Sequence, residues 1–273
     1  MRLAPCAMHR QTFALLLIAA AIVATSPLAP PTFAAAAAAA DRRIPCMSLQ
    51  SLLADASEIP VAHAAQPRRQ RTWVPLQAAM RMPLFPGLRR RRSCALIGSH
   101  PRALADMAKH RARITSADAV VLLNRANGSL IAGILGRRSD IAFVNSRCGA
   151  ACTAASGGSS LIISALDRRV RVAKQTTGYL YNRTALMDRA ASFTLPSTGL
   201  SALIFLLHIC DSITLAGFSR ADEAVQPSWY HTRQGSGAVA TGVHNFAREG
   251  ELRAAMRRCM RTASGRPRIA ILE

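Results

Sequence analysis

Two stretches of the sequence carry residue types that could do chemistry. Pro196-Ser197-Thr198-Gly199 precedes an apolar run, so Ser197 or Thr198 could cap a helix there. The free backbone N–H groups of a first helical turn, together with the helix dipole, form a site for a phosphate or a carboxylate. Further on, His244 lies just before an amphipathic pattern over 246–261, and the positive end of that helix would favour the neutral imidazole of a general base. A plain capped core helix and a surface histidine are the alternatives that these two segments leave open.

The elements that would position these residues alternate between short apolar runs and polar stretches from Cys94 onward. Continuous β-branched runs between helices indicate an α/β sheet with both faces covered. Strands are predicted over 94–98, 119–124, 140–145, 160–164, 170–173, 213–217 and 268–272, and helices over 101–113, 197–210 and 246–261. Because ligands bind outside the carboxyl ends of strands in such sheets, we expect binding residues at the strand ends Gly98, Asn124, Asn145 and Gly217.

Length and charge limit the possible classes of protein. The 273 residues are 50% hydrophobic, which suits one large domain, or a domain with a tail, and excludes a wholly disordered chain. A formal net charge of +21 favours an anionic partner: nucleic acid, membrane headgroups or a phosphorylated small molecule. A basic organellar RNA-binding protein is one alternative, but aromatic residues make up only 5% of the chain and offer few side chains for stacking on bases.

The amino-terminal part predicts entry into the secretory pathway. Basic residues precede the apolar run 13–24, so residues 1–40 are predicted to be a signal peptide or a short signal-anchor, with a transit peptide as the competing interpretation. Residues 41–93 contain several prolines and are predicted to be a stem. The stem ends in the arginine run 89–92, which is a nucleic-acid patch, a processing site or a solvated charge cluster. The folded part is predicted to span 94–273.

Cysteines and sequons give weaker indications. The seven cysteines are an odd number, so at least one is unpaired within the chain. Cys148 and Cys152 lack a second pair with metal-ligand spacing, and the sequence contains no Asp-x-Asp pair, so no metal site is predicted. Asn127 and Asn182 begin glycosylation sequons.

Taken in order, these segments resemble the sialylmotif-containing sialyltransferases, a family of glycosyltransferases. The family's large motif is similar to Cys94-Ala-Leu-Ile-Gly98 with the segments 117–126 and 136–145. Its small motif is similar to Pro196-Ser-Thr-Gly-Leu200, His208-Ile-Cys-Asp211 and Leu215-Ala-Gly-Phe218. Trp229-Tyr230-His231 resembles the third motif, and His244 with Glu249 five residues on resembles the very small motif.

The resemblance implies a Rossmann-like nucleotide-sugar glycosyltransferase fold, a GT-A-like variant, in a single catalytic domain. It implies an enzyme of the Golgi membrane with a luminal catalytic domain (type II), or of the secretory lumen. Such an enzyme transfers sialic acid or a similar acidic sugar from a CMP-sugar to a glycan that ends in galactose. Transfer proceeds with inversion and without a metal or other cofactor, and no nucleic-acid partner is expected.

The resemblance also implies roles for single residues. His244 corresponds to the catalytic base, Glu249 to its supporting acid, and Cys94 and Cys210 to the disulfide between the large and small motifs. Residues expected at the donor are Ser99, Asn124, Asn145, Ser197, Thr198, Gly199, Tyr230 and His231. Ser99 stands where the family commonly has Asn, and Trp229 where the third motif usually begins with His. These departures leave open a relative that binds a CMP-sugar without turnover.

Overall fold

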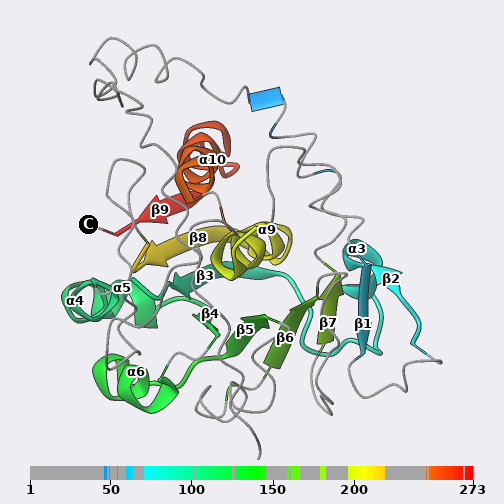
Figure 1. Cartoon of the computed structure of the whole chain (residues 1–273), viewed down its shortest axis with the longest axis horizontal. Coiled ribbons are helices and arrows are strands. Elements are labelled where there is room, and N and C mark those ends of the chain that lie inside the picture. The colour runs from blue at the N-terminus through cyan, green and yellow to red at the C-terminus, as the bar shows by residue number, and fades with distance from the viewer. Residues whose placement is uncertain are drawn as a thin grey trace, which may run out of the picture. The chain divides into compact units, whose positions relative to one another are not determined.

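One sheet of nine strands organises the described residues, in the order β2-β1-β7-β6-β5-β4-β3-β8-β9 (Figure 1). The computed structural model describes residues 46, 47, 49, 54, 60–63, 71–100, 102–124, 127–145, 159, 161–166, 179–182, 196–218, 244, 246–266 and 268–272. The strands are β1 (Pro60–His63), β2 (Val74–Pro75), β3 (Arg91–Ile97), β4 (Ala119–Leu123), β5 (Ile141–Asn145), β6 (Leu161–Leu166), β7 (Tyr179–Asn182), β8 (Cys210–Ala216) and β9 (Ile269–Ile271). From β7 to β9 all neighbours are parallel, whereas β1 is antiparallel to both β7 and β2.

Helices cover both faces of this sheet, which confirms the predicted α/β class (Figure 1). Side chains alternate across a strand, so in β3 Cys94 and Leu96 belong to one core while Ala95 and Ile97 belong to the other. The first core includes α9 and α10, and the second includes α4, α5 and α6. The helices are α3 (Leu76–Ala79), α4 (Ala103–Lys109), α5 (Arg111–Thr115), α6 (Gly128–Leu135), α9 (Thr198–Ile209) and α10 (Phe246–Cys259).

The order in which the chain adds strands to the sheet reverses at β3. The chain runs from β3 through β4 and β5 toward one edge, and returns to place β8 on the other side of β3. At the carboxyl ends of these two strands, the Gly98 N–H donates to the Ala216 carbonyl oxygen at 2.7 Å. A Cβ at Gly98 would collide with the Gly217 carbonyl oxygen, so the two glycines let the chains approach here. Such a switch point is where open α/β sheets bind ligands.

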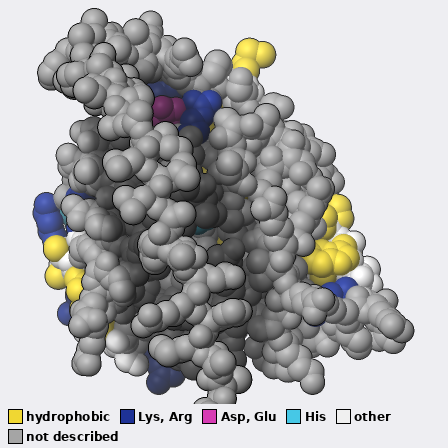
Figure 2. Space-filling view, viewed as in Figure 1, with side chains coloured by type: hydrophobic (Ala, Val, Ile, Leu, Met, Phe, Trp, Pro, Cys, Tyr) yellow, Lys and Arg dark blue, Asp and Glu magenta, His cyan; other side chains and the backbone are white. Residues whose placement is uncertain are grey.

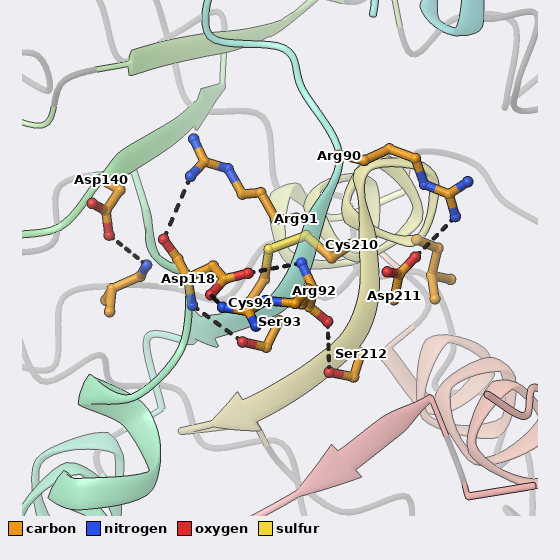
Figure 3. Close-up of a disulfide and its surroundings, with 12 residues drawn as sticks. Arg90, Arg91, Arg92, Ser93, Cys94, Asp118, Asp140, Cys210, Asp211 and Ser212 are labelled. Atoms are coloured by element: carbon orange, nitrogen blue, oxygen red, sulfur yellow. Dashed lines mark hydrogen bonds and ion pairs between the residues drawn. A yellow bond between two sulfur atoms is a disulfide. The ribbon is translucent and has the colours of Figure 1, made fainter. Parts of the chain in front are cut away.

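The opposite end of β3 is held by a disulfide and by charge. Cys94 and Cys210 form the predicted disulfide, with a Cα–Cα distance of 6.0 Å (Figure 3). The Arg90 guanidinium pairs with Asp211 at 2.9 Å, and the Arg92 N–H donates to the Asp118 carboxylate at 2.8 Å (Figure 3). The arginine run therefore ties the start of β3 to the starts of β4 and β8.

The segment 41–93 differs from the predicted stem in its described parts. β1, β2 and α3 lie within it, and Val61, Leu76 and Leu88 are fully buried in the main core. A second disulfide joins Cys46 to Cys259 at the end of α10. Residues 43–273 accordingly belong to one compact unit, so folded structure begins before Cys94. Apolar side chains between the prolines explain the difference, because several of them, such as Leu76, Phe85 and Leu88, are buried in the core.

Other elements also differ from the predictions, among them α6, which was not predicted. The helix predicted over 101–113 is divided into α4 and α5 at His110, whose backbone is not helical. Strand β7 was not predicted, and the strand predicted over 170–173 lies outside the described residues, as does the predicted signal segment 1–40. In the part of the chain that is described, no helix has the length and apolarity to cross a bilayer.

Among the side chains that are described, the basic ones do not gather in one patch on the face shown in Figure 2. They lie at several separate places around its rim, with hydrophobic side chains between them. This distribution agrees with a charge that is spread along the sequence.

Candidate active site

The amino end of α9 is built around Ser197. Ser197 is the N-cap residue, because its Oγ accepts a hydrogen bond from the Leu200 N–H at 3.1 Å. The Ser201 hydroxyl in turn donates to the Ser197 carbonyl oxygen at 2.9 Å. Of the two caps that the sequence allows, the structure selects Ser197, and the helix behind it is buried nearly all round, as predicted.

Glu249, on the first turns of α10, binds this cap. Its Oε1 accepts from the Ser197 N–H and its Oε2 from the Ser197 hydroxyl, both at 2.6 Å. The Glu249 side chain is only 1% exposed, and this burial raises its pKa, while the Ser197 hydrogen bonds and the charges of Arg253 and His244 act in the opposite direction. The very small and small motifs therefore meet through two short hydrogen bonds.

Two backbone donors remain at this helix end. The Ser197 N–H and hydroxyl are both taken by Glu249, and the Leu200 N–H by the cap. The Thr198 and Gly199 N–H groups have no hydrogen-bond partner within the described part of the chain. They are the groups that could bind an anion at this end of α9.

Asn124 and Asn145 lie together at the carboxyl ends of neighbouring strands. Asn124 follows β4 with a φ of 50°, and it is the one non-glycine residue with positive φ among those described. Its Oδ1 accepts from the Asn145 N–H at 3.0 Å, and its own N–H donates to the Phe143 carbonyl oxygen at 2.9 Å. Asparagine tolerates the left-handed conformation, and here this conformation leaves the Asn124 side-chain NH2 group as a donor for a ligand.

The strand ends and the helix end share one edge of the sheet. Leu123, directly before Asn124, lies 3.5 Å from the point where a Cβ on Gly199 would stand. Ser99 follows β3 at the switch point, where the next residue, His100, donates its N–H to the Gly217 carbonyl oxygen at 3.2 Å. Ser99, Asn124, Asn145, Ser197, Thr198 and Gly199 thus lie at the carboxyl edge, and for Asn124 and Asn145 this is the predicted position.

His244 is half-buried just ahead of α10, and its ring centre lies 5.5 Å from that of Phe246. A charge on its ring would lower the pKa of Glu249, so the imidazole lies near the carboxylate that binds the amino end of α9. Tyr230 and His231, together with Trp229, lie outside the described residues. Among the residues that are described, no three His, Cys, Asp or Glu side chains lie close enough to hold a metal ion.

The structure also describes both sequon asparagines. Asn127 is exposed and caps α6, its Oδ1 accepting from the Leu130 N–H at 3.0 Å. Asn182 is the last residue of β7.

The sequence did not predict roles for one buried hydrogen-bond acceptor, Asp106, and one buried cation, Arg253, near this edge. The Asp106 carboxylate in α4 accepts from the Gly217 N–H at 2.9 Å and so fixes the end of β8. Arg253 is only 6% exposed, one turn after Glu249. The spacing of Arg253 from Glu249, four residues along one helix, is the signal that could have identified it.

The sequence was compared with models of known protein families, and one family matches the segment that contains the amino end of α9. The family model of glycosyltransferase family 29 (sialyltransferase) matches residues 163–258, which contain the Ser197 cap, all of α9, His244 and Glu249. This match supports the predicted resemblance to the sialyltransferase family. Sialyltransferases are glycosyltransferases, so the match supports the predicted class of enzyme, and the mostly parallel sheet agrees with the predicted α/β fold.

Two solved structures align with most of this chain. A mammalian sialyltransferase in complex with Gal-beta-1-3GalNAc-ortho-nitrophenol is 19% identical, with a TM-score of 0.47 over 86% of this chain and 88% of that chain. A second structure of a mammalian sialyltransferase is 18% identical, with a TM-score of 0.49 over 86% of this chain and 87% of the other. No curated protein matches the sequence.

Proposed function

We propose that this chain transfers an acidic sugar, sialic acid or a similar acid, from a CMP-sugar to a glycan hydroxyl, with inversion and without a metal ion. The observation that supports this proposal best is the pair of hydrogen bonds from Ser197 to the Glu249 carboxylate. It brings the family's small and very small motifs to one helix end, with His244 five residues before Glu249. The donor sugar and the base would then meet at the carboxyl edge of the sheet.

The CMP phosphate would lie at the amino end of α9. The Thr198 and Gly199 N–H groups and the helix dipole would bind its charge. Ser99, Asn124 and Asn145 at the strand ends would contact the nucleotide, with Tyr230 and His231 as further donor residues. A monophosphate leaving group carries less charge than a diphosphate, so hydrogen-bond donors and a helix end can stabilise it without a divalent ion.

His244 would act as the general base. It would take the proton from the acceptor hydroxyl as that oxygen forms its bond to the anomeric carbon of the donor sugar. The bond from the anomeric carbon to the CMP phosphate oxygen breaks in the same step, and CMP leaves with the electron pair. Attack opposite the leaving group inverts the anomeric centre. Glu249 supports this step through Ser197, because the carboxylate keeps the phosphate-binding helix end next to His244.

We further propose a luminal location in the Golgi, with the apolar segment near the amino terminus as a membrane anchor or cleaved signal. Two disulfides, Cys46–Cys259 and Cys94–Cys210, support an oxidising compartment. Exposed Asn127 would be open to glycosylation there. The acceptor would be a glycan that ends in galactose.

The test is transfer by the full chain from CMP-sialic acid and from CMP-Kdo to a panel of galactose-terminated glycans. We expect turnover with one donor, unchanged by a chelator, and a loss of at least about 10²-fold in kcat for His244→Ala. His110→Ala, at the junction of α4 and α5, is the matched control and should keep full activity. Binding of CMP without turnover would indicate a degenerate relative, and absence of CMP binding would contradict the proposal.

A further inference from the structure

Arg253 is a buried cation for which the proposed reaction has no role so far. It lies on α10 four residues after Glu249, and their exposed fractions are 6% and 1%. Residues at this spacing share one face of a helix, here the face toward α9. Burying an arginine costs free energy unless a partner compensates its charge.

The first partner of Arg253 is Glu249. Burial raises the pKa of Glu249, and the Arg253 charge opposes this rise. In the same way burial lowers the pKa of Arg253, and the Glu249 charge opposes it. Three groups therefore face the Glu249 carboxyl: Ser197 from α9, His244 ahead of α10, and Arg253 from its own helix.

The second partner is Phe218, directly after β8. The Arg253 guanidinium carbon lies 5.7 Å from the centre of the Phe218 ring, within the range of a cation–π contact. The ring also packs on two glycines of the proposed site. A Cβ at Gly98 would stand 3.0 Å from the ring, and one at Gly199 would stand 3.1 Å from it. Phe218 thus connects Arg253 to the end of β3 and to the first turn of α9.

We propose that Arg253 is a positioning residue for the CMP-sugar. It holds the Glu249 carboxylate on Ser197 and the Phe218 ring against Gly98 and Gly199, and both contacts fix the amino end of α9. This inference rests on the proposed function, because the CMP phosphate is the ligand assigned to that helix end. Arg253 itself does not touch the donor.

Removal of the Arg253 charge has a consequence that loss of packing alone does not have. Without this cation, burial acts on Glu249 with less opposition, so the carboxyl keeps its proton to a higher pH. A protonated carboxyl no longer offers two anionic oxygens to the Ser197 N–H and hydroxyl. The amino end of α9 is then held less firmly at neutral pH, and it is restored when the pH is high enough to ionise Glu249.

The experiment compares Arg253→Met, which removes the charge, with Arg253→Lys, which keeps it and loses the planar contact with Phe218. Arg257→Met, on an exposed position of the same helix, is the control. CMP affinity is measured by calorimetry on the full chain across the pH range in which the protein stays folded. We expect Arg253→Met to bind CMP about tenfold more weakly at neutral pH and to approach the wild type as pH rises. Arg253→Lys should lose only a few-fold with an unshifted profile, and Arg257→Met should match the wild type. An unshifted profile for Arg253→Met, or equal losses for the Met and Lys variants, would overturn the proposal.

Two further measurements separate a failure of this inference from other failures. If Arg253→Met does not fold, the double variant Glu249→Gln/Arg253→Met removes both charges of the pair. We expect this variant to bind CMP weakly at every pH, and CMP binding as tight as that of the wild type would overturn the proposal.

If the wild type neither binds CMP nor transfers sugar, the proposed function fails, and thermal unfolding then tests the role of Arg253. The stability of Arg253→Met should fall with rising pH over a wider range than that of the wild type, and the double variant should lose this dependence. Persistence of the dependence in the double variant would contradict the pairing.

Discussion

The two ends of α9 are joined to the rest of the molecule by different chemistry. At the amino end, Ser197 is held by two hydrogen bonds to Glu249, and two backbone N–H groups have no partner in the described structure. At the carboxyl end, the helix passes into β8 at Cys210, which is bonded covalently to Cys94 in β3.

Arg268 completes the carboxyl end. Its Nη2 group donates to the Leu207 and Cys210 carbonyl oxygens at 2.9 and 2.6 Å, and its Nε to the Asp211 carbonyl oxygen at 3.0 Å. These are carbonyls that a helix end leaves without intrahelical partners, and a cation is favoured there by the dipole. Arg268 therefore satisfies the Leu207 and Cys210 carbonyls, and the disulfide cross-links this end of the helix to β3.

The difference shows how one helix can serve both as a fixed core element and as a binding site. A ligand site at a helix end needs free N–H groups, but it also needs a helix that does not move when the ligand arrives. In this molecule the free groups are at one end and the covalent restraint is at the other. The comparison predicts that changes at the carboxyl end act on stability, whereas changes at the amino end act on donor binding.

The largest expected effect comes from the disulfide. Replacing Cys94 and Cys210 by Ser opens a loop with a sequence separation of 116 residues. The free energy of unfolding should fall by about 4–5 kcal/mol, because the unfolded chain is no longer restrained. Denaturant unfolding measures this loss, and each single Cys→Ser variant should match the double variant. CMP affinity of the folded fraction should stay within a few-fold of the wild type; a large loss there would show that the covalent end also shapes the site.

A smaller and more specific effect is expected for Glu249→Gln. The Gln side chain turns one acceptor into a donor, which then faces a donor of Ser197, so kcat/KM for the CMP-sugar should fall by about 10²-fold. Glu251→Gln is the matched control, because Glu251 is exposed two residues further on and pairs with Arg248 at 2.6 Å. Equal activity losses for the two variants would contradict a role for the Ser197 contact.

The same variant makes a prediction about pH. The pKa of Glu249 in the folded protein is raised above the ordinary value of 4.5, mainly by burial. Between the pKa of Glu249 in the unfolded chain and its higher pKa in the folded protein, the folded state binds more protons than the unfolded state. Wild-type stability therefore falls as pH rises from the first pKa to the second. Glu249→Gln should lose this component, which unfolding experiments at several pH values can measure. A slope that stays unchanged in the variant would show that Glu249 does not cause it.

The sequence predicted the edge that carries the site better than the residues that support it. Strands β3, β4 and β5 and helix α9 follow their predicted ranges within a few residues, since each is a continuous apolar run bounded by Gly, Asn or Ser. The Cys94–Cys210 pairing came from the family resemblance, because cysteine counts alone leave the connectivity open. Tyr230 and His231 stay predictions.

What the sequence did not predict depends on distant partners. β1 and β7 are four residues each, and they pair with one another across more than a hundred residues of chain. Cys46 and Cys259 are separated by 213 residues. Arg253 lies in a helix whose Arg257 and Arg258 are exposed, and its burial and its contact with Phe218 distinguish it from them. Local patterns do not contain this information.

A further effect, on stability alone, is expected at the carboxyl end of α9, from His208 in the last turn. Burial and the Arg268 charge lower the pKa of this histidine from 6.5 to about 4. Because the unfolded chain then binds more protons between these values, the free energy of unfolding should fall as pH decreases from about 6.5 to 4, by about 2–3 kcal/mol. His208→Gln should lose this component, while His110→Gln controls for the loss of a histidine outside α9. Glu249 makes the wild type less stable as pH rises, whereas His208 makes it less stable as pH falls, so the two ends of α9 respond to pH in opposite directions. If the free energy of unfolding of His208→Gln still falls between pH 6.5 and 4 as in the wild type, a group other than His208 causes the fall.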